Sequence, residues 1–337
     1  MKKIMYMLMI AALAASCDDK GSNIPEWPWQ DPVEEVPATL DQWTEVSSDY
    51  GTLPAGISIY KSPETLEGKP ALAFIAVADM QTVKWDVWSV ESDDSYATED
   101  SYKTPAKVYE EGKWPVVING GFFYHSDGTN YTSSLAVSGS QLLAYNINYA
   151  SEDWKSIYYP TRAAFIEKED GGFDACWTYL NGEDHFMYPV PAENEWGSKP
   201  QPAPSATYPE GGEPFAAETA IGGGPVLISE GKFVDSYEEE LFGGPSGIGP
   251  DSDQPRTAIG VTSDNKLVFF VCEGREMTEG IMGLTTADVA NVLLDLGCVE
   301  AINLDGGGSS CMLVNGRETI QVSDGSQRSV ASTVMLK

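Results

Sequence analysis

The sequence predicts an α+β fold: a twisted, mainly antiparallel sheet with few helices, whose glycine-rich loops form one cleft. Short runs of β-branched and aromatic residues recur along the chain and are separated by turn residues, which is typical of strands joined by hairpins. Only one stretch clearly has the apolar spacing of a helix. Glycine loops with a polar residue beside them adjoin four of the apolar runs.

The predicted strands lie mainly beyond residue 70. Single strands are expected at 72–80, 83–92, 116–120 and 329–336, and hairpins at 163–180, 224–234, 257–274 and 311–322. The hairpins turn at Asp170-Gly171-Gly172, Glu230-Gly231, 263–266 and Asn315-Gly316. The segment 190–216 is rich in proline, glycine and glutamate, and we interpret it as an insertion or lid.

The clearest helix follows Thr285, which can form a capping-box-like pair with Asp288. Apolar residues then recur at helical spacing up to Leu296, and Gly297 suits the end of the helix. A second helix, with a weaker pattern, is expected near 101–111. The chain therefore runs from helix through turn to strand over 285–304.

The N-terminal residues predict export and lipid anchoring. Two lysines precede an apolar stretch that is too short to cross a bilayer and ends in Ala14-Ala15-Ser16-Cys17. This arrangement resembles a bacterial lipobox, which implies lipidation of Cys17 and a cell envelope lipoprotein in the outer membrane, at the cell surface or on the periplasmic face. We divide the chain into a signal peptide (1–16), a proline-rich tether (17–40), an N-terminal strand-rich part of the fold (41–110) and a main domain (111–337).

The formal net charge is −31, and it becomes −33 when Lys2 and Lys3 leave with the signal. Such a chain repels nucleic acid, so we expect no nucleic-acid partner and membrane contact through the lipid anchor only. An anionic ligand would need a local cluster of the few arginines. The cysteines beyond Cys17 show no spacing typical of a zinc site. The sequence predicts no cofactor, although a divalent cation at Asp305 and Glu273 stays open without any motif that demands one.

The glycine loops carry the candidate chemistry. They are Asn119-Gly120-Gly121, Gly222-Gly223-Gly224, Glu273-Gly274-Arg275 and Asp305-Gly306-Gly307-Gly308-Ser309-Ser310. Glycines let a ligand approach the main chain closely and leave N–H groups free for an anion. The alternative is four separate tight turns. A P-loop is excluded because the lysine is absent, and a dinucleotide fingerprint is excluded because a strand follows the glycines.

Asp305 and Glu273 each end a strand at a glycine loop, which makes paired carboxylates the most plausible catalytic groups. The alternative for either residue is a carboxylate that caps local N–H groups. Ser309 as a hydrolase nucleophile is disfavoured, since no GxSxG elbow is present and only two histidines could serve as its base.

Seven ordered motifs resemble those of the phosphodiester glycosidase domain family, the family of the enzyme that uncovers mannose 6-phosphate by removing N-acetylglucosamine. They are INGGFF, IGGGPVLI, RTAIGV, EGR, GLTTADVA, NLDGGGSS and a late RSV, and the resemblance runs from about 110 to 336. The resemblance implies hydrolysis of a sugar-1-phosphodiester of the N-acetylglucosamine-phosphate-sugar type at its glycosidic bond, releasing free sugar and a phosphomonoester. The expected partner is a phosphorylated glycan substrate.

The resemblance also implies site residues. Asp305 and Glu273 are the expected catalytic carboxylates, although Glu273 stands where the family often has aspartate. The expected substrate-binding residues are Asn119, Gly120, Arg256, Gly306, Gly307, Gly308, Ser309, Ser310 and Arg328. Arg256 suits bidentate phosphate contact, and the N–H groups of 306–308 can complete an anion cradle. The rival interpretation is a non-catalytic glycan-binding surface lipoprotein, whose aromatic side chains stack on sugar rings.

Overall fold

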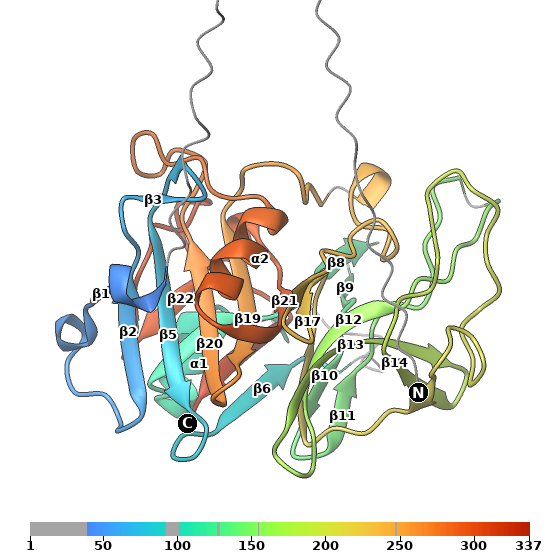
Figure 1. Cartoon of the computed structure of the whole chain (residues 1–337), viewed down its shortest axis with the longest axis horizontal. Helices are drawn as coiled ribbons and strands as arrows, with labels where there is room; N and C mark the ends of the chain where they lie inside the picture. Colours follow the sequence, from blue (N-terminus) through green and yellow to red (C-terminus); the bar gives the residue numbers. More distant parts are fainter. Residues whose placement is uncertain (1–38, 92–100, 127–128, 154, 247) are drawn as a thin grey trace, which may run out of the picture. The chain divides into compact units, whose positions relative to one another are not determined.

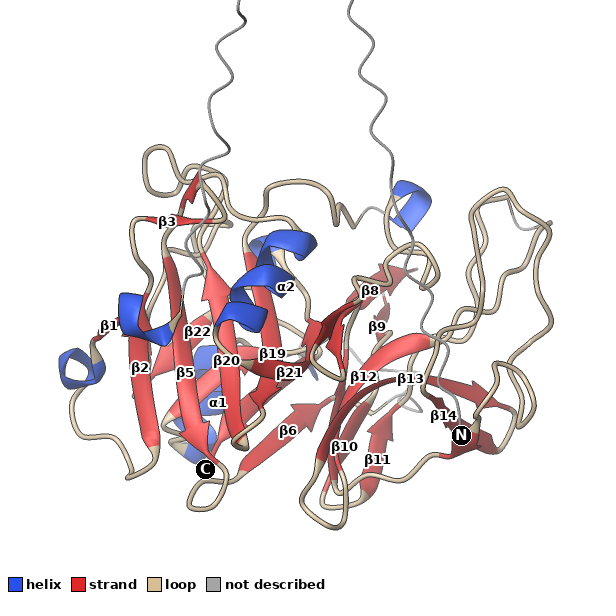
Figure 2. Cartoon of the chain, in the orientation of Figure 1, coloured by secondary structure: helices blue, strands red, loops and turns tan. Residues whose placement is uncertain are grey.

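The computed structural model describes residues 39–91, 101–126, 129–153, 155–246 and 248–337 (Figure 1). The predicted signal peptide, Cys17 and nearly all of the predicted tether lie outside these ranges. Within them the chain forms three large antiparallel sheets and two α-helices (Figure 2), so the predicted mainly antiparallel α+β architecture is confirmed. No helix of the described part is long and apolar enough to cross a membrane.

An eight-stranded sheet carries most of the candidate site. Its strand order is β1-β2-β5-β20-β19-β21-β17-β18, and the pairs are antiparallel. The strands are β1 (Thr44–Glu45), β2 (Ile57–Lys61), β5 (Ala73–Asp79), β17 (Val226–Ser229), β18 (Lys232–Phe233), β19 (Arg256–Thr262), β20 (Lys266–Cys272) and β21 (Cys298–Asn303). Strands from 41–110 thus pair directly with strands of the main domain.

Both faces of this sheet are buried, which explains its nearly continuous apolar strands. In β20, Phe269 faces the core shared with the other two sheets, whereas Phe270 faces the helix α2 (Thr286–Asp295), which covers the opposite face (Figure 1). Alternation along a strand sends successive side chains to opposite faces. A sheet covered on both sides therefore needs apolar residues at nearly every position.

A seven-stranded and a five-stranded sheet complete the described fold. The first has the order β11-β10-β16-β12-β13-β14-β15: β10 (Ala136–Ser138), β11 (Gln141–Ala144), β12 (Arg162–Glu167), β13 (Phe173–Asn181), β14 (Asp184–Tyr188), β15 (Glu213–Pro214) and β16 (Thr219–Gly222). The second has the order β23-β22-β7-β24-β6: β6 (Trp85–Ser89), β7 (Val116–Asn119), β22 (Met312–Val314), β23 (Arg317–Glu318) and β24 (Ser332–Leu336). Two small hairpins add β3 (Thr65–Leu66) with β4 (Lys69–Pro70), and β8 (Phe123–Ser126) with β9 (Thr129–Thr132).

The predicted helices and hairpin turns are confirmed. Thr285 caps α2 in a complete capping box with Asp288, and Gly297 adopts a φ of +87° beyond its end. The weaker helical pattern near 101–111 corresponds to α1 (Pro105–Gly112), which is capped by Thr104. Asn315 and Gly316 both have positive φ between β22 and β23, as the two-residue hairpin turn requires.

The segment 190–216 lies largely between β14 and β15, which pair with each other in the seven-stranded sheet. Side-chain hydrogen bonds attach it to the fold: the Tyr158 hydroxyl donates to the carbonyl of Ser198, and the Thr161 hydroxyl accepts from the N–H of Ala192. It is thus an insertion between neighbouring strands.

Candidate active site

The candidate residues meet at one edge of the eight-stranded sheet. Arg256 begins β19 and lies opposite Cys272, the last residue of β20, so the Glu273-Gly274-Arg275 loop starts beside it. Asn303 ends β21 and lies opposite Ala258 of β19. Antiparallel register therefore brings three segments that are distant in sequence to the same edge.

The loop after β21 is shaped by close contacts that leave no room for side chains. Gly307 has a φ of +60° and starts a short 3₁₀ turn, Gly307–Ser309. A Cβ atom on Gly307 would lie 2.7 Å from Nη2 of Arg275, and one on Gly308 would collide with Arg328 and Asp324. A side chain at either position would thus displace these arginines, while the positive φ of Gly307 and the main-chain carbonyl of Pro255, 2.8 Å from a Cβ atom on Gly306, favour glycine at those two positions.

The main-chain N–H groups of this loop are largely used inside the protein. The N–H of Gly306 donates to Oδ1 of Asp305 at 2.9 Å, and the N–H of Gly307 donates to the carbonyl of Pro255 at 2.8 Å. The expected cradle of free N–H groups from 306–308 is therefore wrong for these two residues. The turn needs those donors to hold its own shape.

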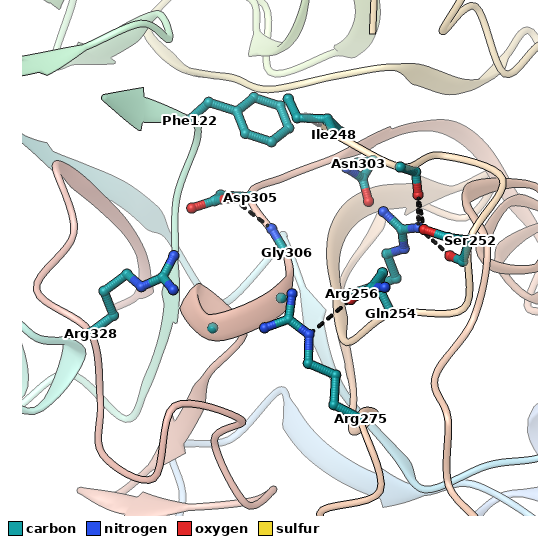
Figure 3. A pocket seen from close by; sticks show the side chains of 13 residues that line it. Phe122, Ile248, Ser252, Gln254, Arg256, Arg275, Asn303, Asp305, Gly306 and Arg328 are labelled. Atoms are coloured by element: carbon teal, nitrogen blue, oxygen red, sulfur yellow. Dashed lines mark hydrogen bonds between the residues drawn. The ribbon is translucent and has the colours of Figure 1, made fainter. Parts of the chain in front are cut away.

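A cavity of about 280 Å³ lies over this loop (Figure 3). We call it the first cavity. It is lined by Phe122, Ile248, Gly249, Ser252, Gln254, Arg256, Arg275, Asn303, Asp305, Gly306, Gly307, Gly308 and Arg328. Three guanidinium groups thus reach one small space beside one carboxyl group, in a chain whose net charge is −31.

Asp305 lies half-buried at the cavity wall. Burial raises the pKa of its carboxyl group to about 6, while the Ser309 hydroxyl and the positive charge of Arg328 act in the opposite direction. Ser309 is buried, and its hydroxyl also accepts a 3.4 Å hydrogen bond from Arg328. The Ser309 hydroxyl therefore connects the carboxyl group of Asp305 with the guanidinium group of Arg328. Ser309 is not among the residues that line the first cavity.

Arg275 and Arg328 approach the glycine loop from two directions (Figure 3). Arg328 donates to Oδ2 of Asp324 through both Nε and Nη2, at 3.0 and 2.5 Å. Arg275 lies 4.0 Å from the other Asp324 oxygen and donates from Nε to Gln254 at 2.8 Å. Both side chains are exposed, so a ligand can reach them, and Asp324 balances part of their charge.

Arg256 reaches the first cavity but has few free donors. Its Nε donates to the carbonyl of Leu284 at 2.8 Å, and its Nη2 contacts the carbonyls of Gly249, Pro250 and Ser252. The expected bidentate contact with a phosphate therefore cannot use the Nε and Nη2 donors, because main-chain oxygens already accept from them. Arg256 instead fixes the loop 249–252 that forms one wall of the cavity.

Asn119 holds the glycine loop after β21 in place through buried hydrogen bonds. It is fully buried, and its Nδ2 donates to the carbonyl of Asp305 at 2.7 Å. Its Oδ1 accepts from the Thr257 hydroxyl at 2.8 Å and from the N–H of Cys311 at 3.1 Å. Asn119 thus joins β7 to β19 and to both ends of the glycine loop, and does not line the first cavity. The carbonyl of the neighbouring Gly120 accepts from the N–H of Asp305 at 3.1 Å.

Asn119→Ala is expected to lower the free energy of unfolding by about 2–4 kcal/mol, because it leaves several buried groups without partners. Urea unfolding followed by tryptophan fluorescence measures this. Asn148→Ala is the control, because it removes one part-buried hydrogen bond from the side-chain amide to the Leu180 carbonyl. It should lower the free energy of unfolding by less than half as much. Equal losses in the two variants would contradict this role of Asn119.

Glu273 does not share the first cavity with Asp305. It is 1% exposed, and Oε1 accepts from the N–H of Gln321 at 2.8 Å, while Oε2 is buried without a hydrogen-bond partner in the described part of the chain. The structure therefore does not bring the two expected catalytic carboxylates together at this cavity. Ser310 is buried as well, and its hydroxyl oxygen also lacks a partner.

Seven residues that line the first cavity were absent from the predicted site, among them Arg275, Asn303 and Gln254. Arg275 and Asn303 belong to the quoted motifs EGR and NLDGGGSS, so a signal existed for both. The Oδ1 atom of Asn303 is buried without a hydrogen-bond partner in a side chain that lines the cavity. Gln254 has no motif of its own, and its role depends on its contact with Arg275.

The four cysteines of the described part, Cys176, Cys272, Cys298 and Cys311, are free and buried. Burial raises the pKa of the Cys272 thiol to about 12 and raises that of the others further. They are small apolar core residues. Within the described residues, no three histidine, cysteine, aspartate or glutamate side chains are grouped so that they could hold a metal ion.

Solved structures share this fold. The chain aligns with the zebrafish N-acetylglucosamine-1-phosphodiester alpha-N-acetylglucosaminidase catalytic domain, auto-inhibited by its pro-peptide, with a TM-score of 0.52 and 18% identity over 87% of this chain and 80% of that one. A hypothetical protein from Synechocystis gives a TM-score of 0.54 and 16% identity over 83% and 62%. A putative exported protein from Burkholderia pseudomallei gives 0.52 and 16% over 79% and 74%.

Sequence comparison covers a smaller part of the chain. An uncharacterised SPbeta prophage-derived protein of Bacillus subtilis, YomE, is 40% identical over 82 residues, which is 24% of this chain and only 12% of that protein. The profile of the phosphodiester glycosidase family matches residues 192–337, which include the first cavity's arginines and Asp305 but not the INGGFF motif. Residues 192–337 therefore match the family that the ordered motifs resemble, that of the phosphodiester glycosidases.

Proposed function

We propose that the protein hydrolyses a sugar 1-phosphodiester at the bond between C1 of the sugar and the phosphate oxygen. The observation that carries this proposal is the first cavity, where Arg275, Arg328 and Asp305 face one another over a glycine loop. The glycine-rich loops would then form one substrate cleft, and an N-acetylhexosamine such as N-acetylglucosamine is the first sugar to test. The protein would act on a phosphorylated glycan.

Exposed arginines and a half-buried carboxyl group suit the two parts of such a substrate. Arg275 and Arg328 can donate to the phosphate oxygens, since guanidinium groups bind phosphate through paired, charge-assisted hydrogen bonds. Arg275 and Arg328 share the single carboxylate of Asp324, so a bound phosphate would balance the remaining positive charge of the two guanidinium groups. The sugar C1 would then lie toward Asp305, on the other side of the glycine loop.

Asp305 would act as the general base. At neutral pH a carboxyl group with a pKa of about 6 is mostly ionised, so it can accept a proton from water as the water oxygen attacks C1. The C1–O bond breaks, and its electron pair stays on the phosphate, which leaves as a phosphomonoester. A leaving group of this kind needs little protonation, and the arginines stabilise the charge that develops on it.

Glu273 would support the site from the protein interior. Its hydrogen bond to the N–H of Gln321 holds the segment that leads to Asp324 and Arg328. Anchoring through Cys17 and an outer-membrane location stay predictions from the sequence, and so does the absence of a cofactor.

Hydrolysis in ¹⁸O-labelled water tests the scissile bond. The proposal predicts label on the C1 hydroxyl of the released sugar and none in the phosphomonoester, measured by mass spectrometry of both products. Label in the phosphate would identify a phosphodiesterase instead. Binding of sugar 1-phosphodiesters without any turnover, with or without added divalent cations, would favour the glycan-binding alternative.

A further inference from the structure

A second cavity, of about 320 Å³, adjoins the first. The two share Phe122, Ile248, Asp305 and Arg328 in their walls, so they adjoin at the candidate catalytic carboxyl group. The remaining walls of the second cavity are Phe123, Tyr124, Ser133, Ile147, Arg162, Gly223, Phe242 and Ser246. A ligand that places its phosphate in the first cavity and its reacting carbon at Asp305 would extend into the second.

The arginines of the chain are concentrated on these two cavities. The sequence contains five arginines, and four of them, Arg162, Arg256, Arg275 and Arg328, line one or both cavities. None of the fifteen lysines is among the lining residues in the described part of the chain. Most guanidinium groups of this strongly acidic protein thus line two adjoining cavities. Arg162 has no role yet in the proposed reaction.

Arg162 is a buried cation that has no polar partner among the described residues. It begins β12, is 7% exposed, and its guanidinium carbon lies 4.1 Å from the ring centre of Phe242. Its Nε is buried with no hydrogen-bond partner, and among the described residues its guanidinium group makes no hydrogen bond or ion pair. A desolvated charge of this kind is unfavourable unless something compensates it.

Glu240 does not hydrogen-bond to Arg162, because its oxygens accept from other donors. Oε1 accepts from Trp177, from the Ser236 hydroxyl and from the N–H of Val226, and Oε2 accepts from the N–H of Ala163. Glu240 therefore fixes the main chain next to Arg162 and attracts the guanidinium only at longer range. The polar edge of Arg162 remains available to a ligand.

We propose that Arg162 is a specificity-determining residue that binds an acidic group on the sugar of the substrate, on the side away from C1. This rests on the proposed function, since it places the phosphate at Arg275 and Arg328 and the sugar in the second cavity. The guanidinium group lies over the ring of Phe242, and Phe122, whose ring centre lies 5.2 Å from that of Phe242, also lines both cavities. The acidic group is a carboxylate or a phosphate, because either compensates a buried guanidinium through charge-assisted hydrogen bonds.

Binding measurements by calorimetry test this without requiring turnover. The probes are glucose 1-phosphate, glucuronic acid 1-phosphate and glucose 1,6-bisphosphate, which share C1 phosphate and differ in the group at C6. We expect at least one acidic probe to bind the full chain about tenfold or more tightly than glucose 1-phosphate. Preference for the glucuronic acid probe identifies a carboxylate, and preference for the bisphosphate identifies a phosphate.

Two substitutions assign the preference to Arg162. In Arg162→Met the ratio of affinities should fall to about one, and in Arg162→Lys, which keeps the charge, part of it should remain. Arg317→Met is the matched control, because Arg317 stacks on Tyr50 and is not among the residues that line either cavity, so the ratio should stay at its wild-type value. Thermal unfolding shows whether each variant is folded.

Equal affinity of the wild type for all three probes would overturn the inference, whatever the variants do. A preference for an acidic probe that persists in folded Arg162→Met would also overturn it. N-acetylglucosamine 1-phosphate serves as a further, neutral probe. If it binds more tightly than both acidic probes and this depends on Arg162, then Arg162 binds a neutral amide and the inference is wrong. These outcomes leave the proposed function intact. Failure of every sugar 1-phosphate to bind, together with absent hydrolysis, would reject the proposed function itself.

Discussion

Asp305→Asn should fold like the wild type and hydrolyse a sugar 1-phosphodiester at least about a hundredfold more slowly. The substitution is nearly isosteric, and the amide oxygen can still accept from the N–H of Gly306, so the loop keeps its shape. What is lost is the group that accepts a proton from water. Initial rates on an N-acetylglucosamine 1-phosphodiester, with stability from urea unfolding, measure the effect.

Glu273→Gln is the matched control for this variant. It makes the same change from carboxylate to amide in a residue that does not line the first cavity, and the hydrogen bond from Gln321 can persist through the amide oxygen. We expect less than about a tenfold loss in rate. Wild-type rates in Asp305→Asn would exclude Asp305 as the base, and a Glu273→Gln loss as large as that of Asp305→Asn would restore the carboxylate pair expected from the sequence.

The same carboxyl group should set the pH dependence. With a pKa of about 6, a base is lost by protonation as the pH falls, so kcat/KM of the wild type should drop about tenfold per pH unit below 6. Folding is linked to this group with the opposite sign. A folded-state pKa above the ordinary value of 3.8 means that ionisation of Asp305 favours the unfolded chain. The resulting loss of folding stability therefore grows as the pH rises from about 4 to 6, and it reaches its full size above pH 6. Asp305→Asn should therefore be somewhat more stable than the wild type at neutral pH.

Local patterns allowed the elements to be predicted, because their causes are local. The capping pair of Thr285 and Asp288 and the turn at Asn315-Gly316 depend on residues a few positions apart, and both occur as expected. The pairing of β5 with β20 joins segments almost 200 positions apart in the chain. Alternating apolar residues show that a strand is buried but not which strand lies beside it.

The site was predictable as a set of loops but not as a set of side-chain roles. The motifs predicted Asp305, Arg256 and Arg328 as site residues, and all three line the first cavity. The register of β19 with β20 and β21 brings the start of β19 and the ends of the other two strands to the same side of the sheet. The roles of Asn119 and Arg256 depend on main-chain oxygens of distant loops, such as those of Asp305 and Gly249, and no spacing in the sequence reveals which donors these will occupy. Arg162 lies in no quoted motif, and its importance follows from the partners that it lacks.

The largest effect on phosphate recognition is expected from Arg275 and Arg328 together. Each single change to methionine should lower kcat/KM by about ten- to a hundredfold, the range expected when a charge-assisted hydrogen bond to the phosphate is lost. The double variant should lose at least as much as the two single losses combined, because Asp324 would then face the incoming phosphate without a guanidinium beside it. Stability should change little, since both side chains are exposed and surface ion pairs contribute little.

Inhibition by inorganic phosphate separates this role from an effect on the chemical step. If the arginines bind the phosphate, the inhibition constant should rise in each variant in parallel with the loss in kcat/KM, whereas Asp305→Asn should leave phosphate binding intact or strengthen it, because a negative charge is removed beside Arg328. Arg317→Met keeps both quantities at wild-type values if the effect is specific to the cavity. A double variant with wild-type kcat/KM and unchanged phosphate inhibition would remove both arginines from the site. The charge balance of the first cavity would then rest on Arg256 alone, whose Nε and Nη2 donors are already bound to main-chain oxygens and could not hold a phosphate through a paired contact.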